Sequence, residues 1–369
     1  MRILFIDTYY KNFQNAFYKK NKSLKKCSYK IQLNALLNES FGTSDSYSYY
    51  LNKENIIAKD LLVNCENLQQ KWALENNLKY TDIRLKIPHK FFKIPLIGKS
   101  LGNLTYLYDI ARSQIDSFKP DILYCQDLSF FSSTILNEIK SQKNIKLIVG
   151  QIACPLPPKS FLKPFDLILT SFPHFVEKLN NQGIKSHYFK IGFDERILSK
   201  IKNQKRDIDF SFVGGISNHH KSAIKTLDYL VSNHDLQVYG YGAKKLPINS
   251  SIRKNHFGEK WGLDMYEILS RTKISFNRHI DVSLNNANNM RLYEATGMGS
   301  LLITDQKDNL NQLFEIDKEI VTYSCKEEAL EKVKYLLKNP QKASEIAHAG
   351  QKRTLKDHTY EIRMRELLE

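Results

Sequence analysis

The sequence predicts an α/β protein with two doubly wound parallel sheets, one in each half of the chain. The length of 369 residues exceeds what one hydrophobic core usually serves, so two domains are expected. The composition, 42% hydrophobic and 25% charged, is typical of an ordinary globular protein. Short apolar runs alternate with helical patterns, and this alternation starts afresh after a charged segment at 195–207.

The first half of the chain, residues 1–195, is predicted to form one domain. Its first strand covers residues 2–6 and ends at Asp7. Further strands are expected at 60–63, 122–125, 145–149, 166–170 and 187–191, and helices at 68–78, 104–118, 132–141 and 175–182. Because helical patterns separate the strands, neighbouring strands should run parallel.

The charged segment 195–207 lacks a core pattern and suits an interdomain linker, so residues 208–350 are predicted to form the second domain. Strands are expected at 208–213, 236–239, 256–258, 273–276, 300–304 and 319–323. Helices are expected at 221–232, 264–270, 288–296, 327–338, 340–350 and 354–368. The second domain therefore ends in a helical tail at 351–369.

The most informative stretch of the chain is 277–305. A short strand ends at Asn277-Arg278, a polar loop follows, and the Asn-rich entry of the next helix can cap its free N–H groups. In a parallel sheet, the carboxyl end of a strand and the amino end of the next helix form a crevice with a positive dipole. Such a crevice suits phosphate and ribose, so this stretch is the candidate binding site.

The net charge of +16 is concentrated in the first half of the chain. Residues 1–200 hold 29 Lys and Arg against 17 Asp and Glu, a net charge of +12. Positive charge attracts nucleic acid, an anionic membrane or an anionic substrate, and charge alone does not choose among them. Two lysine- and aromatic-rich segments, 11–30 and 87–102, could face a membrane. Their structural alternatives are a solvated helix face and a buried loop.

Several classes of protein are disfavoured. No apolar run reaches the roughly 18 residues of a transmembrane helix, and the chain starts directly with a strand pattern, so a cytoplasmic protein is expected. Five scattered cysteines without a C-x-x-C pair suggest neither disulfides nor zinc. The absence of G-x-G-x-x-G after the first strand, and of P-loop and G-x-S-x-G motifs, disfavours a dehydrogenase, a P-loop nucleotidase and an α/β-hydrolase. His219 and His220 have no third ligand spaced nearby, so neither a metal nor a cofactor is expected.

Residues suited to a diphosphate gather in the second domain. Gly214 and Gly215 follow its first strand, where glycine lets the backbone approach a phosphate, although glycine also simply turns a chain. Arg278, with Lys221 and Arg291, could neutralise a pyrophosphate leaving group. Glu294 stands in the first turns of its helix, where it either complements the dipole or accepts hydrogen bonds from a ribose.

Together these residues resemble a known family. The motifs are Asn277-Arg278, Arg291-Leu-Tyr-Glu294, Ala295-Thr-Gly297, the run 300–305, Leu313-Phe314, Glu319, Glu328, Ala349-Gly350 and His358-Thr-Tyr followed by Arg363. In this order and spacing, residues 208–369 resemble the group 1 glycosyltransferases of GT-B fold, particularly the CgeB-like branch. The resemblance implies two Rossmann-like domains facing across a cleft, with the closing helix crossing back over it.

The resemblance also implies roles for individual residues. The second domain would bind a nucleotide-sugar donor, and the first a saccharide or lipid-linked acceptor. Gly214 and Gly215 would line the donor phosphates, Lys221 and Arg278 would contact them, and Asn277 and Arg291 would belong to the same donor site, with Arg291 contributing charge. Glu294 would hold the ribose, and Gly240, Gly242, Phe257 and Gly258 would lie near the base. Arg278 would also act in catalysis, by stabilising the leaving group.

One position departs from the family pattern. Related enzymes often carry an acid eight residues before the ribose glutamate, whereas this chain has Asn286, which leaves retaining or inverting stereochemistry open. An inverting reaction needs a base beside the acceptor hydroxyl, and Asp127 is chosen for it over Asp7 and His174, with a loop cap as its alternative role.

The leading prediction is a metal-independent glycosyltransferase of cell-surface polysaccharide or glycan synthesis, with the basic first domain as the candidate contact with an anionic membrane. The alternatives are a nucleotide-sugar epimerase of the same architecture and a basic nucleic-acid-binding protein. Nucleic acid is not the expected partner, because no recognisable RNA-binding motif accompanies the charge.

Overall fold

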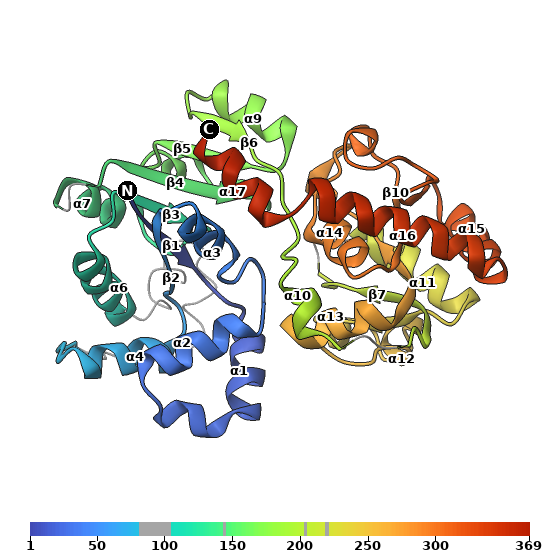
Figure 1. Ribbon diagram of the computed structural model, residues 1–369, viewed down its shortest axis with the longest axis horizontal. Coiled ribbons are helices and arrows are strands. Elements are labelled where there is room, and N and C mark those ends of the chain that lie inside the picture. Colours follow the sequence, from blue (N-terminus) through green and yellow to red (C-terminus); the bar gives the residue numbers. More distant parts are fainter. Residues whose placement is uncertain (81–104, 143–144, 203–204, 218–220) are drawn as a thin grey trace.

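The computed structural model describes residues 1–80, 105–142, 145–202, 205–217 and 221–369. The chain forms two lobes side by side, each built on a parallel sheet with helices packed around it (Figure 1). We call them the amino-terminal lobe, with strands β1–β6, and the carboxyl-terminal lobe, with strands β7–β11. The predicted α/β class and the two doubly wound sheets are confirmed.

The amino-terminal sheet has six strands in the order β2-β1-β3-β4-β5-β6, and all neighbours are parallel. Its strands are β1 (Arg2–Asp7), β2 (Ile57–Leu62), β3 (Ile122–Cys125), β4 (Leu147–Ile152), β5 (Leu167–Thr170) and β6 (Ser186–Tyr188). Most inner positions of β1 and β3–β5 are buried on both faces, because helices cover both sides of a parallel sheet. Strand β2 begins earlier than the apolar pattern predicts, because Ile57 already pairs with Arg2 of β1.

Helices surround the amino-terminal sheet. They are α1 (Lys11–Lys20), η1 (Lys22–Lys26), α2 (Tyr29–Asn38), α3 (Ser46–Lys53), α4 (Glu66–Glu75), α6 (Thr105–Phe118), α7 (Ser133–Gln142), α8 (Lys159–Leu162) and α9 (Pro173–Asn180). None of the described helices of the chain is both long and apolar enough to span a bilayer.

The lysine-rich segment 11–30 folds into α1, η1 and the start of α2. Its aromatic side chains Phe13, Phe17 and Tyr18 are buried in a cluster with Leu36 and Leu62, whereas its lysines are exposed. The expectation that these aromatic residues face a membrane is therefore wrong, because the lobe's own core buries them. The other candidate membrane-facing segment, 87–102, lies outside the described residues.

The carboxyl-terminal sheet has five parallel strands in the order β11-β10-β9-β7-β8. Its strands are β7 (Ile208–Val213), β8 (Gln237–Tyr239), β9 (Thr272–Asn277), β10 (Leu301–Asp305) and β11 (Val321–Tyr323). Residues 256–258 form no sixth strand. Instead, His256 makes an isolated bridge to Val238 beside the short edge strand β8.

The helices of this lobe are α11 (Lys221–Asn233), η4 (Ala243–Lys245), α12 (Ser251–Lys254), α13 (Gly262–Arg271), η5 (Asp281–Ser283), α14 (Met290–Gly297), η6 (Leu310–Gln312), α15 (Lys326–Lys338) and α16 (Pro340–Asp357). The predicted Asn-rich entry of α14 is confirmed, because the Asn289 side chain accepts a hydrogen bond from Leu292 N. In both sheets the strand order reverses beside the first strand, between β1 and β3 and between β7 and β9. Ligands of doubly wound sheets bind at such switch points.

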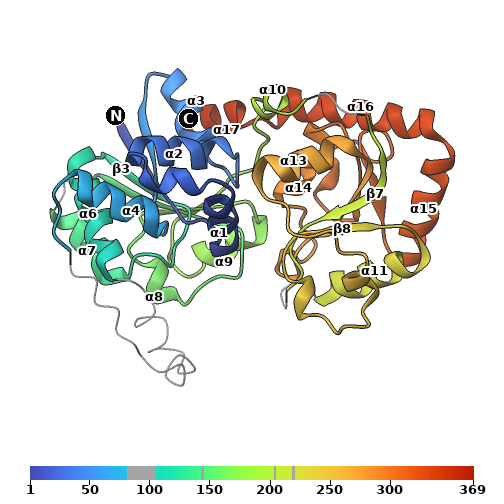
Figure 2. The same cartoon turned by 90° about the horizontal axis from the view of Figure 1, so that it is seen from below.

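The closing helix is shorter than predicted. Residues 351–357 continue α16 on the carboxyl-terminal lobe, and only α17 (Tyr360–Leu368) lies on the amino-terminal lobe (Figures 1 and 2). The chain turns at His358-Thr359, where the Thr359 side chain caps α17 and Phe193 N donates to His358 O at 2.8 Å. The buried Arg363 donates from Nε to Ile191 O at 3.1 Å.

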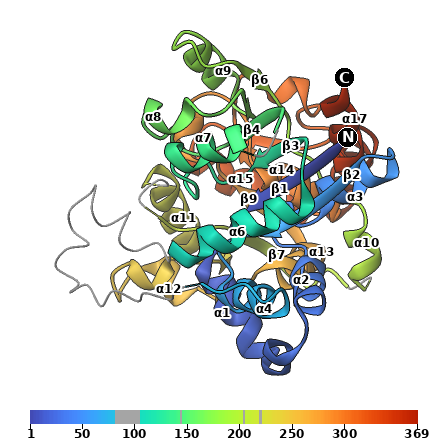
Figure 3. The same cartoon turned by 90° about the vertical axis from the view of Figure 1, so that its left-hand side faces the viewer.

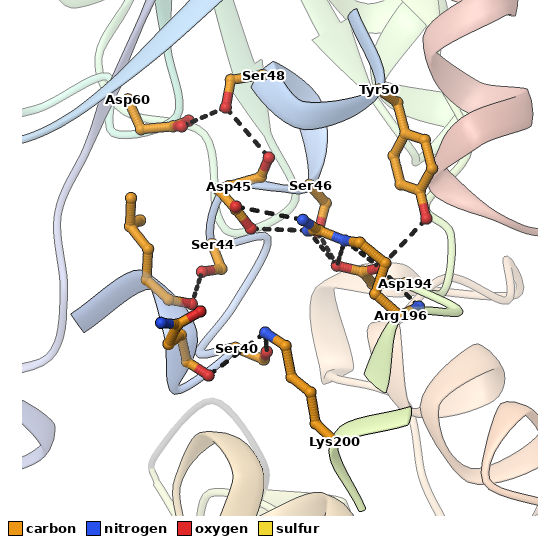
Figure 4. Close-up of polar contacts among 12 residues, drawn as sticks. Ser40, Ser44, Asp45, Ser46, Ser48, Tyr50, Asp60, Asp194, Arg196 and Lys200 are labelled. Carbon is orange, nitrogen blue, oxygen red and sulfur yellow. Dashed lines mark hydrogen bonds and ion pairs between the residues drawn. The ribbon is translucent and has the colours of Figure 1, made fainter. Parts of the chain in front are cut away.

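The interlobe linker is anchored more firmly than its charged sequence suggests. It contains α10 (Ile197–Lys200), whose Ile197 is buried. Arg196 binds Asp45 at 2.7 Å and Asp194 at 2.6 Å, and Asp194 also accepts a hydrogen bond from Ser46 at the start of α3 (Figure 4). Residues 194–196 are therefore fastened to the amino-terminal lobe, because their charges find buried partners there.

Candidate active site

A cavity of about 550 Å³ lies between the two lobes. The carboxyl ends of β1, β3, β7 and β9 contribute to its walls, through Asp7, Gln126, Gly214 and Asn277. The switch points of both sheets therefore open into one cleft, which is where two doubly wound sheets would hold a donor and an acceptor against each other.

Glycines make one wall of the cleft from closely packed backbone. Gly240 adopts a φ of +121°, and a Cβ there would lie 2.0 Å from the carbonyl oxygen of Gly214. Gly242 has a φ of +98°, and its Cβ would lie 1.9 Å from Ile216 O. The 240–242 turn is thereby packed against the end of β7, so that Gly214, Gly215 and Gly240 line the cavity without side chains.

Arg278 is the cationic side chain best placed for an anion. It lines the cavity, its Nη1 donates to Thr226 Oγ1 at 3.3 Å, and its buried Nε has no hydrogen-bond partner. In the described ranges no carboxylate pairs with this guanidinium. A guanidinium that lines a cavity and has no carboxylate partner attracts anions, so Arg278 fits an anionic group in the cleft.

Asn277 has a supporting role. Its Nδ2 donates to Thr304 Oγ1 at 2.9 Å, and its Oδ1 accepts from Asn289 Nδ2 at 2.8 Å. Because Asn289 is the cap of α14, this network aims the amino end of that helix at the cleft.

Arg291 and Glu294 form a buried ion pair at 2.7 Å inside the cleft. Arg291 Nε also donates to Val213 O at 3.0 Å, and Tyr266 OH donates to Glu294 Oε1 at 3.2 Å. Each carboxylate oxygen of Glu294 thus has one protein donor and retains capacity for another. This leaves the carboxylate able to accept from a pair of hydroxyls, such as those of a ribose.

The other predicted site residues are not among the described residues that line the cavity. Gly242 supports the glycine turn, Phe257 is 54% exposed with its ring 5.6 Å from that of Tyr239, and Gly258 O accepts from Gly240 N at 3.0 Å. Lys221 begins α11, and its side chain lies outside the described part. Asp127 accepts hydrogen bonds from Thr8 Oγ1 and Ser129 N, both at 2.8 Å, and is not among the lining residues.

Asp7 is a cleft residue that the sequence reasoning ranked below Asp127. Burial raises the pKa of Asp7 to about 7, and nearby Asp127 adds to this, against a lowering contribution from the Thr8 N–H hydrogen bond. Such a carboxyl group is half ionised near neutral pH, which suits a proton acceptor. Its position at the end of β1 is the signal that could have found it, because β1 is the first strand at the switch point.

Aromatic residues from both lobes form a cluster at one end of the cleft. The rings of Tyr241 and Trp261 stack at 5.7 Å and 9°, and Tyr10 meets Tyr241 edge-on at 5.7 Å. Phe41 lies 5.6 Å from Trp261. Their flat apolar faces suit a base or a sugar ring. The sequence reasoning missed this cluster, because its members are far apart in the chain and follow no helical or strand period.

Asn286, the position that departs from the family pattern, joins the two lobes. Its Nδ2 lies 3.0 Å from Nδ1 of His174, which belongs to α9 of the amino-terminal lobe. The other ring nitrogen of His174 donates to Val282 O at 3.1 Å. His174 is thus neutral with its proton on Nε2, because Nδ1 must accept from the amide. Burial lowers the pKa of His174, in agreement with this form.

Comparisons with known proteins agree with this geometry. Residues 195–369 match a family described as glycosyl transferase-like. HepE from Anabaena, solved with UDP-glucose, has a TM-score of 0.59 and 11% identity over 100% of this chain and 98% of HepE. A glycosyltransferase from Rickettsia africae has a TM-score of 0.57 and 11% identity over 100% of this chain and 96% of the Rickettsia protein. A putative UDP-N-acetylglucosamine 2-epimerase from Listeria monocytogenes has a TM-score of 0.51 and 10% identity over 100% of this chain and 94% of the Listeria protein. No curated protein matched in sequence.

The carboxyl-terminal lobe matches the glycosyl transferase-like family, and the whole chain has the GT-B fold. The family model covers the lobe in which the sequence placed the donor, and the structural neighbours extend the fold over the whole chain. Membership of the CgeB-like branch stays a prediction, as do the roles of the individual site residues.

Proposed function

We propose that this glycosyltransferase transfers a sugar from a nucleotide donor in the carboxyl-terminal lobe to a saccharide or lipid-linked acceptor in the amino-terminal lobe, in cell-surface polysaccharide or glycan synthesis. The observation that carries the proposal is the shared cleft, where an unpaired Arg278 and the buried Glu294 face the end of β1. HepE, which shares the fold, has been solved with UDP and UDP-glucose, so a uridine nucleotide is the first donor to test.

The donor side of the proposal rests on charge. Breaking the bond from sugar to diphosphate develops negative charge on the leaving phosphate. Arg278 and the amino end of α14 would stabilise that charge, while Glu294 accepts hydrogen bonds from the ribose. We propose that this takes place without a metal ion. In the described ranges, no group of three or more His, Cys, Asp or Glu side chains is spaced to hold one.

The acceptor side rests on Asp7. In an inverting reaction the acceptor hydroxyl oxygen forms a bond to the anomeric carbon as the sugar–phosphate bond breaks, and the hydroxyl proton passes to Asp7. Asp127 would then act on Asp7 through its charge and through Thr8, whose N–H and hydroxyl bind the two carboxylates at 2.7 and 2.8 Å. The basic amino-terminal lobe would attract an anionic acceptor or the membrane that carries it.

Nucleotide binding tests the donor site. A ligand at 100 times its dissociation constant stabilises a folded protein by about 2.7 kcal/mol, so uridine, guanosine and cytidine diphosphates can be screened by thermal shift. We expect one of them to raise the melting temperature of the parent, and Glu294→Ala to lose most of that rise.

Glu294 also binds Arg291, so Glu294→Ala removes the partner of a buried charge and lowers the basal stability. The readout is therefore the shift caused by nucleotide, with the isosteric Glu294→Gln as a second variant and the exposed Glu327→Gln as the control. Equal shifts in all four proteins would refute the ribose assignment. No shift with any nucleotide would refute the donor site, and nucleotide release from a sugar donor without acceptor would favour the epimerase.

A further inference from the structure

A second hollow, of about 510 Å³, lies on the amino-terminal lobe between α1, η1 and α4. Figures 1 and 3 show these segments together on the side of the lobe formed by the start of the chain. Four lysines line it, namely Lys11, Lys19, Lys22 and Lys25, with Glu66 as the acid among its lining residues. The floor holds the buried polar residues Gln14 and Tyr18, and amides of Asn15, Asn67 and Gln70 complete the wall.

The positive charge of this hollow is poorly compensated. Lys11 Nζ binds Glu66 at 2.6 Å, and Lys25 Nζ lies 5.9 Å from the centre of the Tyr18 ring. Within the part of the chain that the structure describes, neither Lys19 nor Lys22 reaches a carboxylate. Like charges gathered around one concavity repel each other, and a bound anion relieves that repulsion.

The amino end of α1 adds to the same potential. Helix α1 has no acidic residue in its first turn and no side-chain cap at Tyr10, so its first N–H groups are not met by protein side chains. These free donors carry the positive end of the helix dipole. They lie at the Lys11 end of the hollow, whereas Lys19 stands about 12 Å farther along the helix axis and Lys22 and Lys25 follow its carboxyl end.

The hollow adjoins the catalytic cleft. Tyr10 lines the cleft and the next residue, Lys11, lines the hollow, so their Cα atoms are separated by only about 3.8 Å. The chain therefore passes from one concavity into the other within one peptide unit. A glycan that carries its phosphate in the hollow can therefore extend past Tyr10 into the cleft.

We propose that this basic hollow binds a phosphate group carried by the acceptor, so that the acceptor is a phosphate-bearing glycan or glycolipid and not a neutral sugar. The role as an acceptor subsite rests on the proposed glycosyl transfer, whereas binding of phosphate by the hollow does not. The phosphate can belong to a soluble ester or to a lipid headgroup, because both offer the lysines the same anionic oxygens.

The test compares phosphate binding by four proteins at low ionic strength. They are the parent chain, the double variant Lys19→Gln/Lys22→Gln, a control Lys352→Gln/Lys356→Gln that removes the same charge from exposed positions of α16, and Arg278→Gln in the donor site. The probes are glycerol phosphate by calorimetry, and sedimentation with phosphatidylcholine vesicles with and without 30% phosphatidylglycerol.

We expect the parent to bind, the Lys19/Lys22 variant to bind at least about tenfold more weakly, and the control to change by less than about twofold. Binding to glycerol phosphate identifies a soluble ester as a sufficient ligand, whereas binding to the anionic vesicles alone identifies a lipid headgroup; both support the site. Parent-like binding by the Lys19/Lys22 variant, an equal loss in the control, or no binding of either probe to the parent would overturn it.

The donor site is tested separately with Arg278→Gln and with the Lys19/Lys22 variant. Arg278→Gln should still bind glycerol phosphate, and the Lys19/Lys22 variant should show the parent's thermal shift with nucleotide. If the parent binds no nucleotide, the phosphate measurements still test the hollow. If the parent binds no phosphate in the hollow, the nucleotide measurements still test the donor site. If Arg278→Gln abolished glycerol phosphate binding, the phosphate would occupy the donor cleft and the hollow would not be its site.

Discussion

At the scale of single residues, the cleft pairs side chains whose surroundings set their chemistry. Asp7 and Asp127 end neighbouring strands, yet Asp7 lines the cleft with a pKa raised by burial, while Asp127 accepts hydrogen bonds from Thr8 and Ser129. Across the cleft, Arg278 has no carboxylate partner among the described residues, while Glu294 is held by Arg291. Asp7 therefore has the properties expected of a proton acceptor, with the charge of Asp127 nearby. Arg278 differs from Arg291 in having no carboxylate partner among the described residues.

The first prediction concerns Asp7 and the dependence of activity on pH. The carboxylate is the active form of a base, so kcat/KM of the parent should fall as the pH drops below about 7, the value to which burial raises the pKa of Asp7. Asp7→Asn should lower kcat/KM at least about 100-fold and abolish this dependence. The measurement is release of nucleoside diphosphate from the donor between pH 5.5 and 9 in the presence of acceptor.

Asp127→Asn is the matched variant for this test. Removing the Asp127 charge should lower the pKa of Asp7 and move the fall in activity to a lower pH, with activity retained at pH 8. If Asp127→Asn were inactive and Asp7→Asn active, the base would be Asp127, as the sequence first indicated.

At the scale of elements, the loop between β9 and α14 connects the lobes. Its apolar side chains Ile280 and Val282 pack against the core of the amino-terminal lobe, and Asn286 and Asn288 bind His174 and Ser171. The loop also carries Arg278, so its docking places the cation that we propose binds the donor phosphates. Asn286 is therefore part of an interlobe contact, which gives a physical reason for an amide where related enzymes often have an acid.

The second prediction follows from the Asn286–His174 hydrogen bond. Burial lowers the pKa of His174 below 6.5, and the amide favours its neutral form by donating to Nδ1. In Asn286→Asp the carboxylate accepts from Nδ1–H instead, so the pKa of His174 should rise by one unit or more, about 1.4 kcal/mol in favour of the charged form. Titration of the His174 ring signals by NMR measures this change.

Asn285→Asp adds the same charge at the neighbouring, exposed position and is the control. Asn285→Asp should raise the pKa of His174 much less than Asn286→Asp does. An equal shift in both variants would show that general electrostatics, and not the hydrogen bond, determines the protonation of His174.

At the scale of the whole molecule, the crossing of the chain from α16 to α17 ties the lobes together behind the cleft (Figure 2). The neutral ring of His358 stands at that crossing, donating from Nε2 to Leu313 O at 2.8 Å and accepting at Nδ1 from Arg363 at 2.9 Å. Arg363 in turn binds Ile191 O on the amino-terminal lobe. One histidine therefore links contacts on both sides of the crossing.

The third prediction is a loss of stability in mild acid that depends on His358. Burial lowers the pKa of His358 to about 4, so the unfolded chain binds this proton more readily and the stabilisation is lost as the pH falls from about 6.5 toward 4. Between pH 7.5 and pH 5.0 this group should remove about 2 kcal/mol from the free energy of unfolding. Urea denaturation at the two pH values measures it.

His358→Gln should be less stable than the parent at pH 7.5, and the difference should shrink at pH 5.0 because the variant has no proton to gain. His348→Gln, at an exposed position within α16, should keep the parent's dependence on pH. A constant difference between His358→Gln and the parent at both pH values would contradict the assignment.

Much of the fold follows from local pattern. Buried apolar runs mark strands such as β1 and β10, and Asn289 caps α14 as the Asn-rich entry predicts. The ends of elements are harder to predict, because they depend on pairing with distant residues. Pairing with Arg2 starts β2 at Ile57, and His256 makes only an isolated bridge to Val238. Among candidate site residues, Gly214, Gly240, Arg278, Arg291 and Glu294 meet in the cleft, because they follow the carboxyl ends of β7, β8 and β9 or lie on α14, the helix after β9.

The sequence by itself determined the two parallel sheets, the crevice at 277–294 and the charged character of the amino-terminal half, because periodicity and composition are local properties. The tertiary structure decided which aromatic residues are core, that Asp7 and not Asp127 lines the cleft, and that Asn286 meets His174. It also decided which lysines surround a hollow beside that cleft. Such facts depend on contacts between segments far apart in the chain, which only the packing of the two lobes brings together.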